Sequence, residues 1–349
     1  MKKKVAVAIS GGVDSAVCAL LCKKEGYEVI GVTMRLLENE DRIEKAREIA
    51  KKIGIPHYTI DIRKIFKKYI ITNFCEEYKK GRTPNPCIRC NQYIKFGVLL
   101  KKAKQLGAKY LATGHYARIE YNKEKGKYLL KKGCDLDKDQ SYFLYRLTQK
   151  ELAYILMPLG NFTKDKIKEI AREQKLPIEE DMRESQEICF IPENNYSEFL
   201  KKYLSEEIKP GLILDTQGKL LGKHKGIIFY TIGQRRGLGI SAKIPLYVVE
   251  INEEENALIV GPENELYKSN LEVCEVSYVT EDKLKKSLNS KVKIRYRHKE
   301  APAIVYPLED KKVHIKFTQP QRAITPGQSA VFYNEDIVIG GGVIEKVLV

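Results

Sequence analysis

The first third of the chain alternates short apolar runs with segments in which apolar residues recur at helical spacing. The apolar runs that predict strands lie at residues 5–9, 27–34, 57–62 and 110–113. The segments that predict helices lie at residues 13–25, 39–53, 65–78 and 94–106. This alternation indicates a parallel sheet with helices on both faces, in which ligands bind at the carboxyl ends of the strands.

The pattern changes twice beyond this region. Residues 81–91 hold two prolines and two cysteines and predict a loop of fixed shape, and residues 117–132 predict a hairpin. Residues 140–205 are polar with helical spacing. After residue 208, short strands are predicted at 227–232, 246–251, 257–260, 292–296, 313–317 and 330–333.

These patterns predict an α/β protein of three parts. Residues 1–139 form a nucleotide-binding and catalytic domain with a parallel sheet. Residues 140–207 form a small helical middle domain, and residues 208–349 form β-barrel-like units. At 349 residues the chain is long enough for two or three domains.

The net charge of the chain indicates the kind of molecule that it binds. Lysine and arginine exceed aspartate and glutamate by 16, and such an excess in a globular chain indicates a polyanion such as nucleic acid or an anionic membrane surface. No apolar run approaches the roughly 20 residues of a membrane span, so we expect no membrane insertion.

The eight cysteines are too few for a disulfide scaffold in a chain of this length. We therefore expect a reducing, cytoplasmic compartment, in which a cysteine pattern indicates metal binding or catalysis. Cys87 and Cys90 form a C-x-x-C pair, and Cys189 lies far along the chain. The pair alone is compatible with a redox centre, half of a zinc site or part of an iron–sulfur site. Arg89 between the two thiols is expected to favour the thiolate form.

The string Ser10-Gly11-Gly12-Val13-Asp14-Ser15 follows the first strand and opens the first helix. Glycines let the backbone approach an anion closely, and the amides of a helix N-terminus point toward it. Asp14 would repel a phosphate directly but can position Mg²⁺ on a pyrophosphate. The string differs from the P-loop, which has Lys-Ser/Thr after its last glycine, and it resembles the signature of the PP-loop ATP pyrophosphatases.

Other segments indicate contacts with RNA. Lys291, Lys293, Arg295 and Arg297 alternate along an apparent strand, which would place four cations on one face of a sheet for binding phosphates. The segment from Lys138 through Asp139 and Gln140 to Phe143 mixes charged, amide and aromatic groups that suit unpaired bases. His115, at the end of the 110–113 strand, is a candidate general base or RNA contact and equally a structural histidine.

Taken together, these motifs resemble the tRNA-specific 2-thiouridylases along the whole chain. The resemblance rests on S-G-G-V-D-S at 10–15, T-P-N-P-C-I-R-C-N at 83–91, I-K-F at 94–96, T-G-H-Y at 113–116, K-D-Q-S-Y-F-L at 138–144, I-C-F-I at 188–191, T-I-G-Q-R-R-G-L-G at 231–239 and the segment 321–328. It implies that ATP adenylates O2 of the wobble uridine of a tRNA, that pyrophosphate leaves, and that sulfur then displaces AMP.

The resemblance also implies roles for individual residues. Cys189 takes the place of the persulfide-bearing cysteine and Cys90 that of the nucleophile. Met34 and Gly114 would contact the adenylate, Asn85, Pro86 and Cys87 the target base, and His115, Lys138, Asp139, Gln140, Arg295, Tyr296 and Gln328 the tRNA. The sulfur would come from a persulfide carrier protein or from free sulfide.

Two departures from the family pattern matter. Many relatives have Asp in place of Cys87, and the segment after the second strand, 35–41, is shorter than is common. The first departure leaves two sulfur chemistries open. Cys87, Cys90 and Cys189 can be ligands of a [4Fe–4S] cluster, which is slightly favoured because three converging thiolates need a neutralising cation. Alternatively, Cys90 and Cys189 exchange a persulfide and a disulfide without metal.

Two other functional classes remain at this point. Another PP-loop ATPase, such as an amidotransferase-type synthetase with a small-molecule substrate, would explain residues 10–15 but not the cysteine pair or the charge. A non-catalytic RNA-binding protein would explain the charge but not Asp14 and the cysteines.

Overall fold

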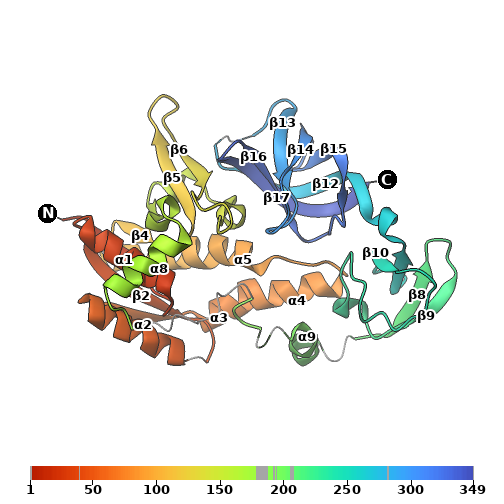
Figure 1. Ribbon diagram of the computed structural model, residues 1–349, viewed down its shortest axis with the longest axis horizontal. Coiled ribbons are helices and arrows are strands. Elements are labelled where there is room, and N and C mark those ends of the chain that lie inside the picture. Colours follow the sequence, from red (N-terminus) through yellow and green to blue (C-terminus); the bar gives the residue numbers. More distant parts are fainter. Residues whose placement is uncertain are drawn as a thin grey trace.

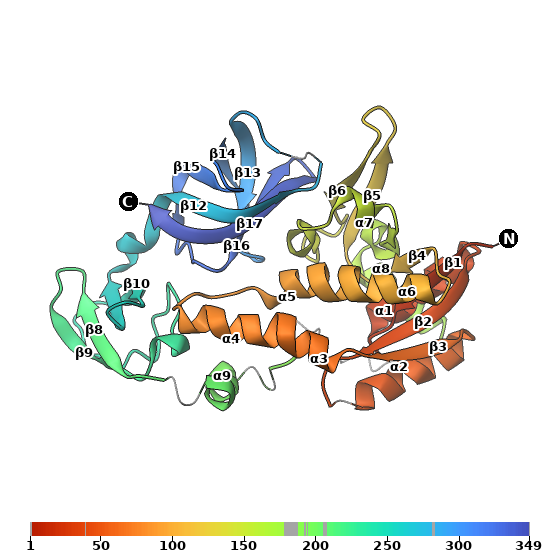
Figure 2. The ribbon, with the colours of Figure 1, turned by 180° about the vertical axis from the view of Figure 1, so that it is seen from behind.

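The computed structural model describes residues 2–38, 40–177, 188–191, 193, 195–204, 208–280 and 283–348 of the 349-residue chain. Its three sheets lie side by side, with a pair of long helices between the first sheet and the β8–β11 unit (Figures 1 and 2). Within the described ranges, no helix combines the length and the apolar character that crossing a bilayer requires.

The N-terminal sheet is parallel, as the sequence predicts, with strand order β3-β2-β1-β4-β7. Its strands are β1 (Lys4–Ala8), β2 (Glu28–Arg35), β3 (His57–Asp61), β4 (Tyr110–Ala112) and β7 (Ile155–Leu156). The central strand β1 is apolar on both faces because both are covered: Val5 and Val7 pack under α1 (Val13–Lys24) and α2 (Glu40–Ile53), while Ala6 faces the opposite core.

The segment after residue 140 is mostly helical, but part of it belongs to this sheet. It contains η3 (Ser141–Leu144), α7 (Gln149–Leu152), η4 (Pro158–Asn161) and α8 (Lys164–Glu173). Between α7 and η4, strand β7 pairs with β4 and extends the parallel sheet. Helix α8 packs against α1 through the apolar side chain of Ile167. The predicted domain limits at 139 and 207 stay predictions.

Two continuous helices run outward from the sheet (Figure 2). The first comprises α3 (Arg63–Phe66), η1 (Lys67–Ile71) and α4 (Thr72–Lys79), and the second comprises α5 (Pro86–Arg89), η2 (Cys90–Leu99) and α6 (Leu100–Gln105). The second helix corrects part of the loop predicted for residues 81–91: residues 82–85 have no regular secondary structure, whereas residues 86–91 are helical. Pro86 occupies the first helical position, where a missing N–H costs nothing, so both cysteines of the C-x-x-C pair lie on the helix.

The next unit is a four-stranded sheet with order β10-β11-β8-β9. Its strands are β8 (Gly211–Asp215), β9 (Leu220–His224), β10 (Tyr247–Asn252) and β11 (Ala257–Gly261), and α9 (Tyr196–Leu204) lies beside it. The strand predicted at 227–232 is wrong, because this segment contains the 3₁₀ helix η7 (Ile227–Phe229). Ile227 and Ile228 are both buried in one core, which the alternating faces of a strand do not permit.

The C-terminal sheet is antiparallel and closes on itself, which confirms the barrel-like prediction. Its main strands are β12 (Tyr267–Tyr278), β13 (Leu288–Lys293), β14 (Ala301–Pro307), β15 (Val313–Arg322), β16 (Ser329–Asn334) and β17 (Ile337–Leu348), and η8 (Glu263–Leu266) precedes them. β12 pairs with both β15 and β17, so the sheet returns to its first strand. The predicted hairpin, β5 (Ala117–Asn122) and β6 (Lys127–Lys132), extends this sheet through β17.

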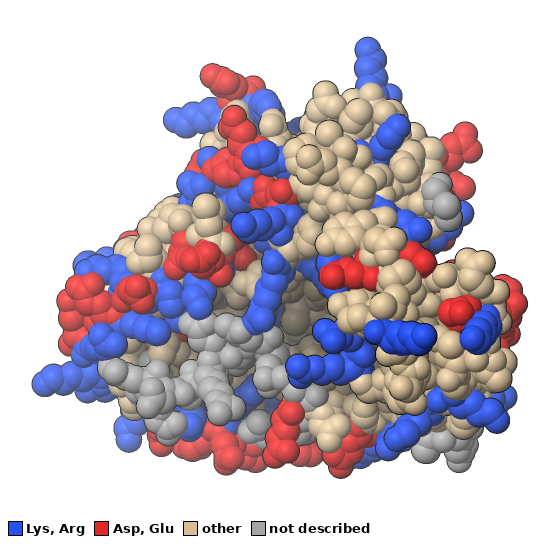
Figure 3. Space-filling model, turned by 45° about the vertical axis from the view of Figure 1, so that its right-hand side comes forward, with Lys and Arg blue, Asp and Glu red and all other residues tan. Residues whose placement is uncertain are grey.

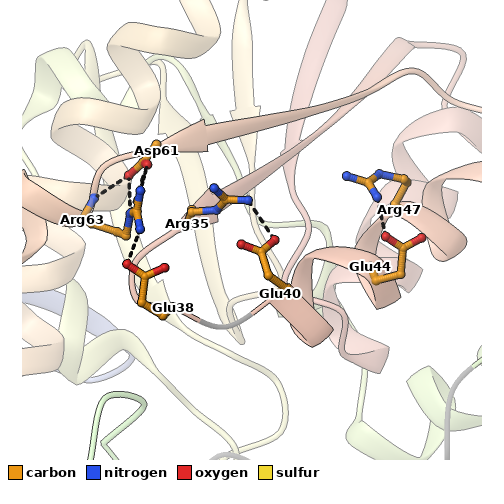
Figure 4. A network of polar contacts seen from close by, with 7 residues as sticks. All are labelled: Arg35, Glu38, Glu40, Glu44, Arg47, Asp61 and Arg63. Carbon is orange, nitrogen blue, oxygen red and sulfur yellow. Dashed lines mark hydrogen bonds and ion pairs between the residues drawn. The ribbon is translucent and has the colours of Figure 1, made fainter.

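Ion pairs surround the short segment after β2 (Figure 4). Arg35 pairs with Glu40 at 2.8 Å, and Arg63 pairs with Glu38 and with Asp61. The hydrogen bonds from Arg63 lower the pKa of Asp61 to about 2. Because these groups are exposed, each pair contributes little to stability, but together they connect the ends of β2 and β3 across a short connection.

Barrel closure generates a stability prediction at Gly342 in β17. A Cβ atom there would lie 2.5 Å from the backbone oxygen of Cys274 and 2.6 Å from a Val273 methyl group, so β12 could not stay this close. We expect Gly342→Ala to lower the free energy of unfolding by about 1–3 kcal/mol, measured by urea denaturation. The matched control is Gly222→Ala in β9, where a Cβ would lie 2.9 Å from one side-chain methyl group of Ile240 and near no backbone atom, so a smaller loss is expected. Equal stability of the two variants would contradict this prediction.

Candidate active site

The glycine turn after β1 has the shape of an anion site. Gly11 has φ +87°, in the left-handed region that favours glycine. The Ser15 hydroxyl donates to Gly12 O at 2.9 Å and accepts from Ser10 N at 3.1 Å, which fixes the turn. Gly12 precedes α1 without a side-chain cap, so the first amides of α1 face the turn.

Asp14 lies in the first turn of α1 and is held by two partners. Lys164 Nζ, from the start of α8, lies 2.7 and 2.9 Å from the two carboxylate oxygens, and the Tyr116 hydroxyl donates to Oδ1 at 2.7 Å. The carboxylate and the ammonium therefore meet beside the glycine turn. A carboxylate can bind a magnesium ion there, and a lysine can bind a phosphate oxygen.

Gly114 brings the end of β4 against this turn. A Cβ atom at Gly114 would lie 2.9 Å from the Asp14 carbonyl carbon and 3.0 Å from its oxygen, so only glycine fits. Met34, near the end of β2, is partly buried and packs on both neighbouring cores. Both residues therefore lie at the carboxyl edge of the sheet, and their contact with an adenylate stays a prediction.

The three candidate cysteines gather in one place. Cys87 and Cys90 lie on the helix that begins at Pro86, and the neighbours of Cys189, Ile188 and Phe190, pack in the same core as Cys90. Solvent reaches Cys87 and Cys189, yet the surrounding protein still desolvates them. Desolvation raises the pKa of Cys87 to about 11 and that of Cys90 to about 12, and it also raises the pKa of Cys189. All three are therefore thiols at neutral pH.

Lys95 is a cation close to all three thiols, and Arg42 is a second cation close to Cys189. The charge of Lys95 lowers the pKa of all three cysteines, and that of Arg42 lowers the pKa of Cys189, so both oppose part of the effect of burial. The expectation that Arg89 favours thiolate is wrong, because burial dominates and the opposing charges are those of Lys95 and Arg42. Arg89 instead lies 5.4 Å from the Tyr93 ring centroid.

His115 joins the lysine to the turn after β4. It is buried, and desolvation, followed by the charge of Lys95, lowers its pKa well below the usual value, so it is neutral. Lys95 Nζ lies 3.4 Å from Nε2 and can only donate, so Nδ1 carries the proton and donates to Thr113 Oγ1 at 2.8 Å. The imidazole thus has a partner on each nitrogen, which agrees with a structural role that links Lys95 to the turn after β4. The contact of His115 with tRNA stays a prediction.

The cysteines do not form a metal-binding group in this arrangement. Within the described ranges, no three side chains of His, Cys, Asp or Glu are placed to hold one metal ion. The preference for a [4Fe–4S] cluster therefore has no support here. That preference assumed that three converging thiolates repel one another, but the raised pKa values of the three cysteines keep them protonated and uncharged. Three neighbouring thiols that stay protonated need no neutralising metal.

The segment before Cys87 is clamped by two other parts of the fold. Thr83 N donates to Pro326 O at 2.9 Å, and the Thr83 hydroxyl is hydrogen-bonded to that of Thr231. Gln328 Nε2 donates to Thr83 O at 2.8 Å. Gln328, which is expected to contact the tRNA, thus holds the segment that leads to Asn85. Its contact with tRNA stays a prediction.

The Lys138–Gln140 segment forms a structured turn. The buried Asp139 carboxylate accepts hydrogen bonds from Gly133 N at 3.1 Å and from the Ser141 hydroxyl at 2.8 Å. Gln140 Oε1 accepts from Tyr116 N at 3.1 Å. Tyr142 is fully buried, so it does not offer a ring face to a base as expected. The tRNA contacts of Lys138, Asp139 and Gln140 stay predictions.

The alternating cations at 291–297 do not share one sheet face, which corrects the sequence-based expectation. Strand β13 ends at Lys293, and the chain then bends. The Arg295 guanidinium turns inward and donates to the carbonyl oxygens of Arg322 and Ala323. Tyr296 packs on Phe143 with ring centroids 4.4 Å apart. Contacts of Arg295 and Tyr296 with tRNA stay predictions.

Known families match the chain along its length. Three family models match, described as a tRNA methyl transferase HUP domain over residues 3–193, a tRNA methyl transferase PRC-barrel domain over 197–262 and an aminomethyltransferase beta-barrel domain over 268–344. The chain is 51% identical to tRNA-specific 2-thiouridylase MnmA 2 of Thermoanaerobacter sp. (strain X514), covering 100% of this chain and 99% of that protein. It is 49% identical to tRNA-specific 2-thiouridylase MnmA of Acetivibrio thermocellus, covering 99% of each.

The chain belongs to the family of tRNA-specific 2-thiouridylases. The descriptions of two family models mention methyl transfer, but the full-length relatives at about half identity are named as thiouridylases. The tRNA-specific 2-thiouridylases are tRNA sulfurtransferase enzymes, and the predicted family resemblance is confirmed.

Two residues of this thiouridylase site were missed by sequence reasoning. Lys95 lies in the I-K-F string five positions after Cys90, and Lys164 begins α8. A lysine has no local signature, and helix η2 and helix α8 bring these two to the site only through tertiary packing. The signal that could have identified Lys95 is its place on the same helix as the cysteine pair.

The position of Lys95 predicts a change in thiol reactivity. Removing its charge in Lys95→Met should raise the pKa of Cys189, so alkylation of Cys189 between pH 8 and 9.5 should become several-fold slower, measured by mass spectrometry of the labelled peptide. Lys95→Arg should retain the rate, and Lys101→Met, on an exposed position of the same helix, is the matched control. An unchanged rate in Lys95→Met would show that its charge does not act on the thiols.

Proposed function

We propose that this enzyme forms 2-thiouridine at the wobble position of tRNA, by ATP-dependent adenylation of uridine O2 followed by sulfur transfer through Cys189 and Cys90. One observation carries the proposal: the turn 113–116 connects the glycine turn to the thiols. Gly114 packs on Asp14, and His115 contacts Lys95, which faces the three cysteines. An oxygen activated beside Asp14 would therefore lie close to the sulfur that replaces it.

In the first half-reaction, uridine O2 attacks the α-phosphorus of ATP and pyrophosphate leaves. Ser10, Gly11, Gly12, Val13 and Ser15 supply the anion-binding turn, and Asp14 would hold Mg²⁺ on the departing pyrophosphate. Lys164 Nζ lies within 2.9 Å of both Asp14 oxygens, so beside a bound pyrophosphate it would also be within reach of a phosphate oxygen. Met34 and Gly114 are placed to border the adenylate.

In the second half-reaction, the terminal sulfur of a Cys189 persulfide attacks C2 of the uridine and AMP leaves. Cys90 then attacks the Cys189 sulfur, which forms a Cys90–Cys189 disulfide and releases the thiocarbonyl. The persulfide sulfur gains two electrons, the two cysteines lose two, and an external dithiol must reduce the disulfide before the next turnover. A persulfide carrier protein transfers its outer sulfur to the Cys189 thiol, whereas free sulfide would have to attack the Cys90–Cys189 disulfide, which yields the Cys189 persulfide and the Cys90 thiol without the external dithiol. Cys87 lies at the target base as a small neutral thiol.

The tRNA partner agrees with the excess of 16 positive charges. Lys and Arg side chains flank a hollow near the middle of the face in Figure 3. Phosphate contacts from such side chains make binding depend strongly on salt concentration. Asn85 and Pro86 would contact the target base, which must leave its stack to reach them.

The adenylation step predicts the effect of Asp14→Asn. This change keeps the size of the side chain but removes the charge that would hold the metal, so release of pyrophosphate from ATP and tRNA should fall about a hundredfold or more. Asp165→Asn, at an exposed carboxylate on the first turn of α8, is the matched control. Release at the wild-type rate by Asp14→Asn would exclude Asp14 from the first half-reaction.

The sulfur-transfer step predicts a separation of the two half-reactions. Cys189→Ser and Cys90→Ser should still bind tRNA and release pyrophosphate but form no 2-thiouridine, measured by chromatography and mass spectrometry of the digested tRNA. Cys134→Ser, at an exposed cysteine, should behave as wild type. Formation of 2-thiouridine by Cys189→Ser would remove the persulfide from that residue.

A further inference from the structure

A cavity lies away from the residues that are proposed to carry out the reaction. It has a volume of about 310 Å³ and is lined by residues from the end of α4, from α9 and from the segment 228–234. This volume is at the lower end of the range of small-ligand pockets. No residue assigned to the reaction lines this cavity.

The walls offer ring faces together with a few polar groups. Tyr78, Tyr196 and Phe229 are partly exposed in the cavity, and Thr231 and Gln234 lie beside them. The two tyrosines are positioned by the buried Phe74, whose ring centroid lies 4.9 Å from that of Tyr78 and 6.5 Å from that of Tyr196. Aromatic rings fixed in this way can stack on a nucleobase without losing much side-chain entropy.

The polar residues at the edge of the cavity, Thr231 and Gln234, are fixed by hydrogen bonds and connect to the segment before Cys87. Gln234 Oε1 accepts from Thr231 N at 3.2 Å, and Gln234 N donates to Thr231 O at 3.1 Å. The Thr231 hydroxyl is hydrogen-bonded to that of Thr83. Thr83 is two positions before Asn85, so the cavity is adjacent to the segment that leads to Asn85, which is proposed to contact the target base.

The surroundings of the cavity carry positive charge. Lys201 Nζ, from α9, lies 5.8 Å from the Phe229 ring centroid. Arg235 and Arg236 follow Gln234 directly and are exposed. A ligand with an aromatic face and a phosphate on each side matches this combination, and a nucleotide within an RNA strand has this chemistry.

We propose that this cavity binds an unpaired nucleobase of the tRNA other than the target uridine, by stacking on Tyr196 and Phe229. The proposal rests on the proposed function, because it takes the tRNA as the ligand. Binding a neighbouring base would hold the anticodon loop open while the target uridine enters the catalytic site. The cavity thereby selects RNA whose loop is unpaired on both sides of the target.

The test combines protein variants with a tRNA in which each unpaired residue of the anticodon loop is made abasic in turn. Dissociation constants are measured for the full chain by fluorescence anisotropy at several salt concentrations. With the wild-type protein, loss of one base other than the target should weaken binding about tenfold. With Phe229→Leu or Tyr196→Leu, binding of intact tRNA should already be about tenfold weaker, and the same abasic change should have no further effect.

The matched control is Tyr203→Leu, which removes a ring from the same helix α9 at a position 39% exposed and outside the cavity. It should bind both forms of tRNA as wild type does. The slope of log affinity against log salt should be unchanged in the two leucine variants, because stacking neutralises no phosphate. Replacing Arg235 and Arg236 by alanine should flatten that slope.

Two results would overturn the proposal, and they differ from a failure of the proposed function. If intact tRNA binds but the two leucine variants bind it as wild type does, the cavity takes a ligand other than RNA. If Phe229→Leu and Tyr196→Leu lower the affinity by the same factor whichever base of the loop is missing, the two rings stabilise the fold and do not bind one particular base. If the wild-type protein binds no tRNA, the proposed function itself fails.

Discussion

The four-residue turn after β4 is the constraint on which the rest of the site depends. Gly114 lets the turn pack against Asp14 where a Cβ atom would lie only 2.9 Å from the Asp14 carbonyl carbon, and the Tyr116 hydroxyl donates to the Asp14 carboxylate. Between them, His115 contacts Lys95 on the helix of Cys87 and Cys90. A single turn thus connects Asp14 and the glycine turn to the helix that carries Cys87 and Cys90. A side chain at Gly114 would separate them.

A second constraint comes from the barrels. Thr83 accepts a hydrogen bond from Gln328 of the C-terminal sheet and shares another with Thr231 beside the four-stranded unit. The helix with the cysteines begins three residues later at Pro86. These hydrogen bonds tie the segment that leads into the cysteine helix to both β-rich units, so a displacement of either unit would also displace the start of that helix.

The parts of this fold that sequence could predict are those with local signals. Val5 and Val7 lie in a short apolar run before a glycine turn, which identified β1 and the anion site. The helix at Pro86 was taken for a loop because two prolines stand close together, although proline is common at the first helical position. The alternation of Lys291 to Arg297 was taken for one face of a strand, but alternation alone does not pair a strand, and β13 ends at Lys293. Lys164 could not be predicted, because only tertiary packing brings α8 to the site, whereas Lys95 could have been identified only if residues 86–99 had been recognised as one helix.

The chemistry of the cysteines depends in the same way on packing. Cys90 was expected to ionise more easily beside Arg89, whereas desolvation raises its pKa to about 12 and Lys95 opposes this only in part. Because the thiolate is the nucleophilic form, a Cys90 that stays protonated at neutral pH is expected to react slowly with thiol reagents.

If one continuous site first activates an oxygen of tRNA and then replaces it with sulfur, the two half-reactions must be coupled one to one. To test this, the wild-type enzyme is incubated with ATP, tRNA and a persulfide donor, and AMP, pyrophosphate and 2-thiouridine are counted in the same sample. We expect equal amounts of the three products, and none of them when tRNA is omitted. Formation of 2-thiouridine without AMP, or release of AMP and pyrophosphate without any 2-thiouridine, would contradict it.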